Sequence, residues 1–167
     1  MKAISFAGAL SLVLLSSCAA RAEVPDAIAA PGELLVALVH AQGAQIYECK
    51  AGASGQLTWK FREPVATLLD ERGKTIGRHY AGPHWELDDG SIVAAKAVGR
   101  APGATPQDIP LLKLETTERR GNGRLADVST IQRLDTKGGT AEGVCPTAGA
   151  LMSVPYSADY AFYRKAR

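Results

Sequence analysis

Apolar and polar residues alternate along most of this chain, in short runs that glycine, proline and aspartate interrupt. Alternation with a period of two is typical of strands that place one face against a core, and no run longer than about ten residues has a convincing helical period. The pattern therefore predicts strands over residues 34–40, 45–50, 57–62, 64–70, 75–80, 84–87, 91–98, 110–118, 124–135 and 155–163.

Polar connections that contain glycine separate several of these strands. They cover residues 41–44, 71–74, 88–90 and 119–123, and glycine supplies the positive φ that tight turns need. The Asn-Gly pair in the last of them is a strong hairpin signal. Residues 100–108, with two prolines, form the longest irregular loop, in which a short helix is the alternative.

Many short strands with repeated turns predict an all-β fold: a single antiparallel β-sandwich or barrel-like domain of about eight to ten strands over residues 33–167. Period-two spacing places Trp85 and Leu87 on its inner face, together with the aromatic residues at even positions in 155–163. Residues 23–32, with two prolines among small residues, indicate a flexible lead-in.

The first 22 residues lie outside this pattern. Lys2 precedes an apolar run at 7–15, too short to span a bilayer, and small residues follow, which is the order of a secretory signal peptide. An A-x-A site ends at Ala22, but a lipobox-like Leu-Ser-Ser-Cys ends at Cys18. The second site makes 1–17 the signal and tethers the domain to a membrane through a lipid on Cys18. We predict export to the periplasm or the medium, free or tethered.

The net charge of the mature domain argues against a nucleic-acid partner. The chain has 19 Lys+Arg and 17 Asp+Glu, a formal charge of +2, but cleavage after Ala22 removes Lys2 and Arg21 and leaves 17 of each sign. A neutral domain without a basic run lacks the charge that neutralises phosphates in nucleic-acid complexes. We therefore predict no nucleic-acid partner, and membrane association only through Cys18.

Cys49 and Cys145 remain in the domain after either cleavage. Disulfides persist in exported proteins, so we predict that these two cysteines bond to each other. The closed loop of about 97 residues gives a chain-entropy stabilisation of up to ~4.5 kcal/mol. The alternatives are two free thiols or shared metal ligation, and two cysteines without C-x-x-C spacing make a poor zinc site.

Residues 77–91 contain the densest set of chemically reactive side chains. His84, Glu86 and Asp88 alternate along a predicted strand and so share one face. An imidazole with two carboxylates suits a divalent metal ion, whose identity is unknown, or acid–base chemistry. The alternative is the solvated face of a half-buried strand.

His79 joins these three residues only if Gly82-Pro83 bends the strand back on itself, and proline in a sheet marks an edge or a bulge. The alternative is a structural, hydrogen-bonded histidine. Glu86 with Asp88 or Asp89 also has the composition of a glycosidase carboxylate pair. An Asp-Gly turn capped by the preceding aspartate explains the two aspartates more simply.

Six features of the mature chain form a recognisable set: QIYEC at 45–49, GRHYAGPHWE at 77–86, IPLL at 109–112, IQRLDTKGG at 131–139, the cysteine at 145, and PYSADYAFY at 155–163. Together they resemble a family of small exported bacterial proteins, with fungal relatives, that is known only as a domain of unknown function. The matching segments extend over essentially the whole mature chain.

The resemblance implies export and a single all-β domain, and it supports the pairing of Cys49 with Cys145 because both lie in matching motifs. It implies no activity. The family pattern more usually has threonine in place of His84 and tryptophan in place of Leu111. The first difference argues against His84 as a shared catalytic or metal-binding residue and leaves His79 as the better candidate.

We predict no catalytic residue and no cofactor, since the sequence lacks nucleophile-elbow, phosphate-loop, dinucleotide-binding, HExxH and EF-hand motifs. The candidate binding residues are His79, His84, Glu86 and Asp88. The predicted role is non-catalytic binding of a small ligand, glycan or envelope component, or a structural role in the cell envelope. The alternative is a hydrolase or metal-dependent enzyme that uses His79 and Glu86.

Overall fold

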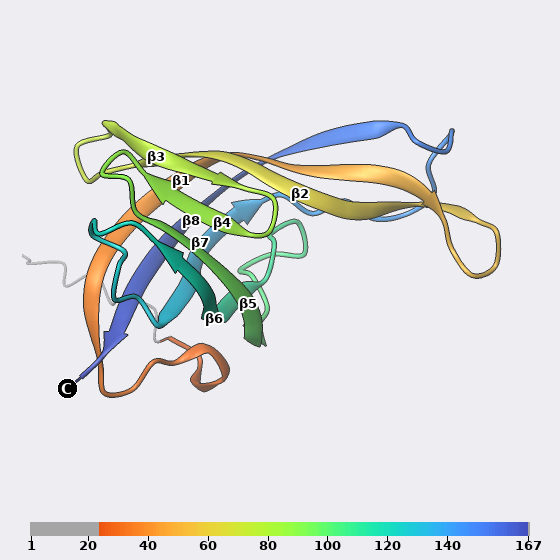
Figure 1. The fold of residues 1–167 in the computed structure, drawn as a ribbon. Helices are drawn as coiled ribbons and strands as arrows, with labels where there is room; N and C mark the ends of the chain where they lie inside the picture. The colour runs from red at the N-terminus through yellow and green to blue at the C-terminus, as the bar shows by residue number, and fades with distance from the viewer. Residues whose placement is uncertain (1–23, 167) are drawn as a thin grey trace, which may run out of the picture.

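Eight antiparallel strands close into one barrel in the computed structural model of the protein, which describes residues 24–166 (Figure 1). Each strand pairs with its neighbours in chain order, and β1 also pairs with β8, which closes the ring. The all-β prediction is confirmed, in its barrel form. The elements are a 3-10 helix, η1 (Asp26–Ile28), and β1 (Glu33–Ala51), β2 (Leu57–Leu69), β3 (Thr75–Tyr80), β4 (His84–Leu87), β5 (Ile92–Ala101), β6 (Leu111–Arg120), β7 (Thr130–Gly138) and β8 (Leu151–Lys165).

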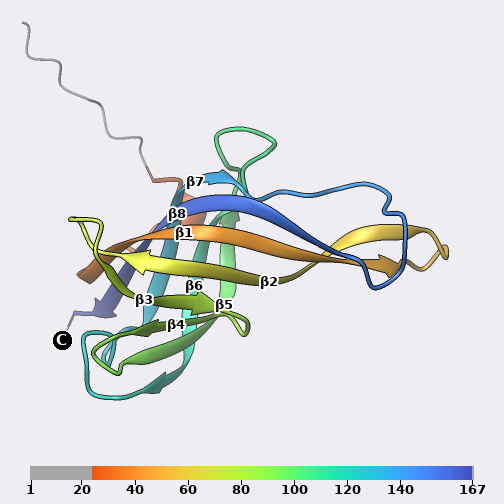
Figure 2. The same cartoon turned by 90° about the horizontal axis from the view of Figure 1, so that it is seen from above.

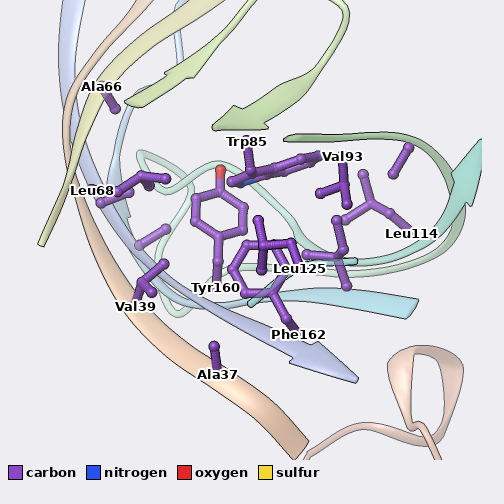
Figure 3. Packing of buried hydrophobic residues seen from close by; sticks show 14 of the residues in the cluster. Ala37, Val39, Ala66, Leu68, Trp85, Val93, Leu114, Leu125, Tyr160 and Phe162 are labelled. Atoms are coloured by element: carbon purple, nitrogen blue, oxygen red, sulfur yellow. The ribbon is translucent and has the colours of Figure 1, made fainter. Parts of the chain in front are cut away.

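The core of the barrel consists of side chains that point inward from alternate strand positions. Trp85, Tyr160 and Phe162 are its largest fully buried members and meet near the barrel axis (Figure 3). Trp85 and Leu87 face inward as predicted, and so do the aromatic residues at even positions of β8. Period-two burial on both strands is what a half-solvated antiparallel sheet requires.

The β6–β7 connection differs from the predicted Asn-Gly hairpin. β7 begins only at Thr130, and the loop before it inserts Leu125 and Val128, both fully buried, into the core. The loop is held on the β4–β5 turn, because the Asp89 carboxylate accepts a hydrogen bond from the backbone N–H of Arg124 at 2.7 Å. A long-range anchor of this kind overrides the local turn preference, and the loop fills this end of the barrel.

Three strands continue beyond the barrel as an arm, which we define as residues 45–63 and 140–154 (Figure 1, Figure 2). β1 runs into the arm without interruption, so the predicted turn at residues 41–44 is wrong. Gly43 instead allows β2 to approach, since a Cβ there would overlap the carbonyl oxygen of Val65 and the Cα of Ala66. A glycine within a strand can mark such a close approach as well as a turn.

The predicted disulfide is confirmed and lies in the arm. Cys49 of β1 bonds to Cys145, with their Cα atoms 5.8 Å apart. The segment around Cys145 also pairs with β2, since its backbone N–H donates to the carbonyl of Leu57 and Trp59 donates to Gly143. The staple therefore holds an otherwise irregular segment across the β1–β2 hairpin.

The predicted flexible lead-in, residues 23–32, is described from Val24 onward, and around Ile28 it packs on the outer wall of the barrel. Ile28 is fully buried, and its carbonyl accepts a hydrogen bond from Gln132 of β7. Lys113 of β6 donates to the carbonyl of Ala29 at 2.8 Å. The predicted signal segment and Cys18 lie outside the described residues. Within residues 24–166, no helix has the length and apolar character to cross a membrane.

The remaining connections follow the predicted turns closely. Gly73 and Gly90 adopt positive φ in the β2–β3 and β4–β5 hairpins. Residues 102–110 form turns instead of a short helix, and Asp108 organises them by accepting hydrogen bonds from the backbone N–H groups of Thr105 and Gly138. The barrel is thus closed by turns at one end and continues into the arm at the other.

Candidate functional site

A cavity of about 410 Å³ lies in the barrel at the end that carries the arm. It falls within the size range of small-molecule sites in proteins. All eight strands and the β3–β4 turn contribute to its wall: Gln45, Phe61, Arg62, Pro64, His79, Gly82, Pro83, Trp85, Ala95, Lys96, Ala97, Leu112, Leu114, Arg133 and Tyr160. Apolar atoms make up most of this lining. The cavity thus lies inside the barrel wall and opens at the root of the arm, where exposed residues such as Phe61 and Arg62 line it.

Three aromatic rings form the inner part of the wall. His79 of β3 faces Trp85 of β4 in register, and their rings stack with centroids 4.4 Å apart and planes at 14°. Tyr160 of β8 reaches across the barrel and meets both rings edge-on, at 5.1 Å from His79 and 5.2 Å from Trp85. Stacked and edge-to-face pairs are favourable ring geometries, so the rings hold one another in place.

His79 is a neutral imidazole with a defined tautomer. Its Nδ1 lies 2.7 Å from the carbonyl oxygen of His84, and because a carbonyl only accepts, Nδ1 carries the proton and donates. Burial of the ring lowers the pKa of His79 to about 3, with a smaller contribution from the positive charge of Arg133 and with the hydrogen bond to His84 opposing the shift. Nε2 is therefore left as an acceptor.

Several buried polar atoms around the cavity have no hydrogen-bond partner among the described residues. They include Nε2 of Gln45, Nε1 of Trp85 and the hydroxyl of Tyr160, and each of these side chains is at most 2% exposed. Native proteins leave few such groups, since each costs about 1–3 kcal/mol of desolvation. Groups of this kind beside a cavity are available to a bound molecule.

Arg133 is the charged member of the inner wall. It lies opposite Leu112 of β6 and Tyr160 of β8 in the ladder, and both of these residues line the cavity. Its Nε donates to the carbonyl of Pro110 at 3.0 Å. Burial raises the pKa of the Tyr160 hydroxyl, and the nearby guanidinium opposes that rise. Arg133 thus supplies a fixed positive charge beside the aromatic rings.

The outer face of β3 and β4 carries a separate polar network. Arg78 donates to Glu86 at 2.8 Å, the Tyr80 hydroxyl donates to the same carboxylate at 3.0 Å, and the Tyr80 ring stacks on His84. The hydrogen bond from Arg78 lowers the pKa of Glu86. His84 also hydrogen-bonds through Nδ1 to the carbonyl of Ala81. These groups satisfy one another on an exposed surface.

The structure separates the four predicted binding residues. Gly82-Pro83 does turn the chain, but the register places His79 opposite Trp85 on the inner face, with His84 and Glu86 on the outer face. Asp88 lies in the β4–β5 turn. The turn is capped by Asp89 itself, through Ser91, and not by the preceding aspartate.

This separation bears on the predicted chemistry. His79 and Glu86 lie on opposite faces of one ladder, so the sheet keeps them from acting on the same atom. Among residues 24–166, no group of three or more His, Cys, Asp or Glu side chains has a geometry that holds a metal ion. On the outer face, Glu86 and His84 both have hydrogen-bond partners within the protein.

Sequence analysis missed Gln45 and Arg133 as members of the site. Both are polar residues at inward positions of strands whose other inward residues are apolar, as Ile131 is beside Arg133 on β7. A polar residue that breaks an inward-facing period is the signal that was present. Tyr160 was predicted as a core residue, and it both packs in the core and lines the cavity.

Comparison with known proteins gives one match. The family model described as a protein of unknown function, DUF3455, matches residues 30–164. The chain belongs to the DUF3455 family. The match begins at the segment that follows η1 and ends within β8, so membership covers both the barrel and the arm. No curated protein and no solved structure matches the chain.

Proposed function

We propose that this member of the DUF3455 family is an exported, non-catalytic binding protein that takes a small, mainly apolar molecule into the barrel cavity. The observation that carries the proposal is the set of buried, unpartnered polar atoms on Gln45, Trp85 and Tyr160 beside an apolar cavity of about 410 Å³. Convergent polar groups in an apolar, enclosed pocket are typical of ligand sites. Eight-stranded barrels are also wide enough to hold one small ligand.

The cavity is preferred over the outer face as the binding place. His84 and Glu86 already have partners there, so a ligand would have to break existing hydrogen bonds to reach them. His79 contributes to binding as a rigid wall residue that offers one acceptor at Nε2. The disulfide and the predicted signal segment support export, since disulfides persist in oxidising compartments.

The proposal is tested with N-phenyl-1-naphthylamine, a neutral apolar probe whose fluorescence rises when it leaves water. Ala97 lines the cavity, so Ala97→Trp fills it and is expected to weaken probe binding by at least about tenfold. Val98, the next residue, is exposed like Ala97 but does not line the cavity, so Val98→Trp serves as the matched control. Equal probe binding by both variants and the wild type would contradict the proposal.

A further inference from the structure

We infer that the ligand is a small apolar carboxylate whose charged head pairs with Arg133 inside the barrel. The inference rests on the proposed function and adds the chemical class of the ligand. Its basis is a juxtaposition in the cavity wall: a half-buried guanidinium faces a cavity whose lining contains no aspartate or glutamate. Charges withdrawn from water are normally paired, and here the protein supplies no anion.

Arg133 has no carboxylate partner among the described residues. Its Nε donates to the carbonyl of Pro110 and its charged end acts on the Tyr160 hydroxyl, but none of the ion pairs among the described residues includes it. Its charge acts on the tyrosine hydroxyls and on His79, which locates the guanidinium near the polar atoms of the wall. A planar guanidinium recognises a carboxylate with two parallel hydrogen bonds.

The other charges around the cavity strengthen this preference. Arg62 and Lys96 also line it, but Arg62 is paired with Glu63, with Nε and Oε1 3.1 Å apart. Lys96 is exposed at the rim and forms no ion pair with any described residue. Lys96 lies opposite Glu115 in the β5–β6 ladder, so Arg133 inside the cavity is the stronger attraction for an anion, and Lys96 at the entrance adds to it.

The remaining wall defines the rest of the ligand. Leu112, Leu114 and the aromatic rings present apolar surface, which favours an apolar body. Nε1 of Trp85 can only donate, and the hydroxyl of Tyr160 can donate, so both suit the oxygen atoms of a carboxylate. An apolar acid therefore satisfies the unpartnered donors and the uncompensated charge together.

Isothermal titration calorimetry on the mature wild-type protein tests the inference. We compare 2-naphthoate with 2-naphthamide, which has nearly the same shape and no charge. The carboxylate is expected to bind at least about tenfold more tightly, a factor that corresponds to ~1.4 kcal/mol. The advantage is expected to shrink when salt is added, because the rim charge at Lys96 is screened.

Equal affinities, or binding of N-phenyl-1-naphthylamine without binding of 2-naphthoate, would overturn the inference and leave the proposed function standing. If none of the three compounds binds, the proposed function itself fails.

Variants then locate the charge. Arg133→Gln is expected to remove the preference for 2-naphthoate and to leave 2-naphthamide affinity within about twofold. Arg78→Gln makes the same charge change on the outer face and is expected to preserve the preference. Near-ultraviolet circular dichroism checks that each variant is folded.

Should Arg133→Gln not fold, Lys96→Gln at the exposed rim provides the test. It is expected to weaken the binding of 2-naphthoate about two- to fivefold at low salt and to leave the binding of 2-naphthamide unchanged. Retention of the full preference in a folded Arg133→Gln would place the head group elsewhere and refute the inference.

Discussion

Three of the eight barrel strands, β1, β2 and β8, continue into the arm, yet different forces hold the barrel and the arm together. In the barrel, the inward residues of β1, such as Val39 and Ala41, are covered by the opposite wall. In the arm, the same alternation continues through Tyr47 and Cys49, but there is no opposite wall. The same alternation of side chains thus runs through both regions of β1. The two regions differ in what packs over the inward-facing side chains.

A single segment provides that cover in the arm. The Tyr47 hydroxyl donates to the carbonyl of Gly139 at 2.7 Å, and Cys49 bonds to Cys145. Little apolar surface is buried in return, since Phe61, Val144 and Leu151 are all more than half exposed. The barrel is therefore stabilised by its hydrophobic core, whereas the arm depends on a covalent staple and backbone ladders.

The two tryptophans of the chain offer the sharpest test of this difference. Trp85 is fully buried in the barrel, and Trp59 is half-buried in the arm. Trp85→Ala is expected to lower the free energy of unfolding by about 3–5 kcal/mol, because it leaves a large void in a packed core. Trp59→Ala is expected to cost about 1 kcal/mol. Urea unfolding of both variants measures the difference. Equal losses would mean that the arm has a core of its own, and the comparison would break.

Removal of the disulfide probes the arm from the other side. The double variant Cys49→Ala, Cys145→Ala is expected to lose about 2–4 kcal/mol of stability, since it frees a long loop in the unfolded chain. In the native state, amide hydrogen exchange is expected to accelerate in residues 143–151 and at the tip of the β1–β2 hairpin. Exchange in β4 and the near-ultraviolet spectrum of the core are expected to stay unchanged. Loss of the core spectrum would show that barrel and arm order together.

The comparison also explains which parts of the fold the sequence predicts. Period-two alternation assigns Trp85 and Leu87 to the core, because a barrel strand packs one face against apolar side chains and turns the other face to solvent. The pairing of Cys49 with Cys145 is predicted because disulfides persist in exported proteins and only these two cysteines remain after the predicted cleavage. These signals are local or depend on composition, so one sequence contains them.

The errors arise where distant backbone contacts decide the structure. Gly43 has the local signature of a turn, but its role is to admit β2, a contact that only the assembled sheet reveals. The β6–β7 loop is set by the hydrogen bond from Arg124 to Asp89, 35 residues away in sequence. Contacts between residues so far apart in sequence do not appear in the alternation of apolar and polar residues.

The sequence does not single out the cavity as a candidate site, for a related reason. Grouping His79 with Glu86 depended on a bend, and the bend exists, but the ladder register assigns the two side chains to opposite faces. A shift of register by one residue would exchange those faces. Gln45 and Arg133 come from strands far apart in the chain and meet only when the barrel closes.

The pH dependence of stability provides the last and smallest test, because it asks whether the barrel interior is as dry as its packing indicates. Unfolded His79 titrates near its ordinary pKa of 6.5, but burial lowers the pKa of the folded residue to about 3. Between these values the unfolded chain binds a proton that the folded chain does not, so stability falls as the pH falls. From pH 7 to pH 5 the expected loss is about 2 kcal/mol, at ~1.4 kcal/mol per pKa unit.

Urea unfolding at several pH values, for the wild type and for His79→Gln, isolates this contribution. The variant is expected to show a shallower slope between pH 5 and pH 7. Carboxylates such as Glu86, whose pKa is lowered by Arg78, contribute stability that is present above the ordinary pKa of 4.5 and is lost as the pH falls from there through the lowered pKa of the folded state. Their effect therefore lies outside the window. An unchanged slope in His79→Gln would mean that the imidazole is solvated in the folded state. Water would then reach the inner wall, and the dry barrel would differ from the open arm less than its packing implies.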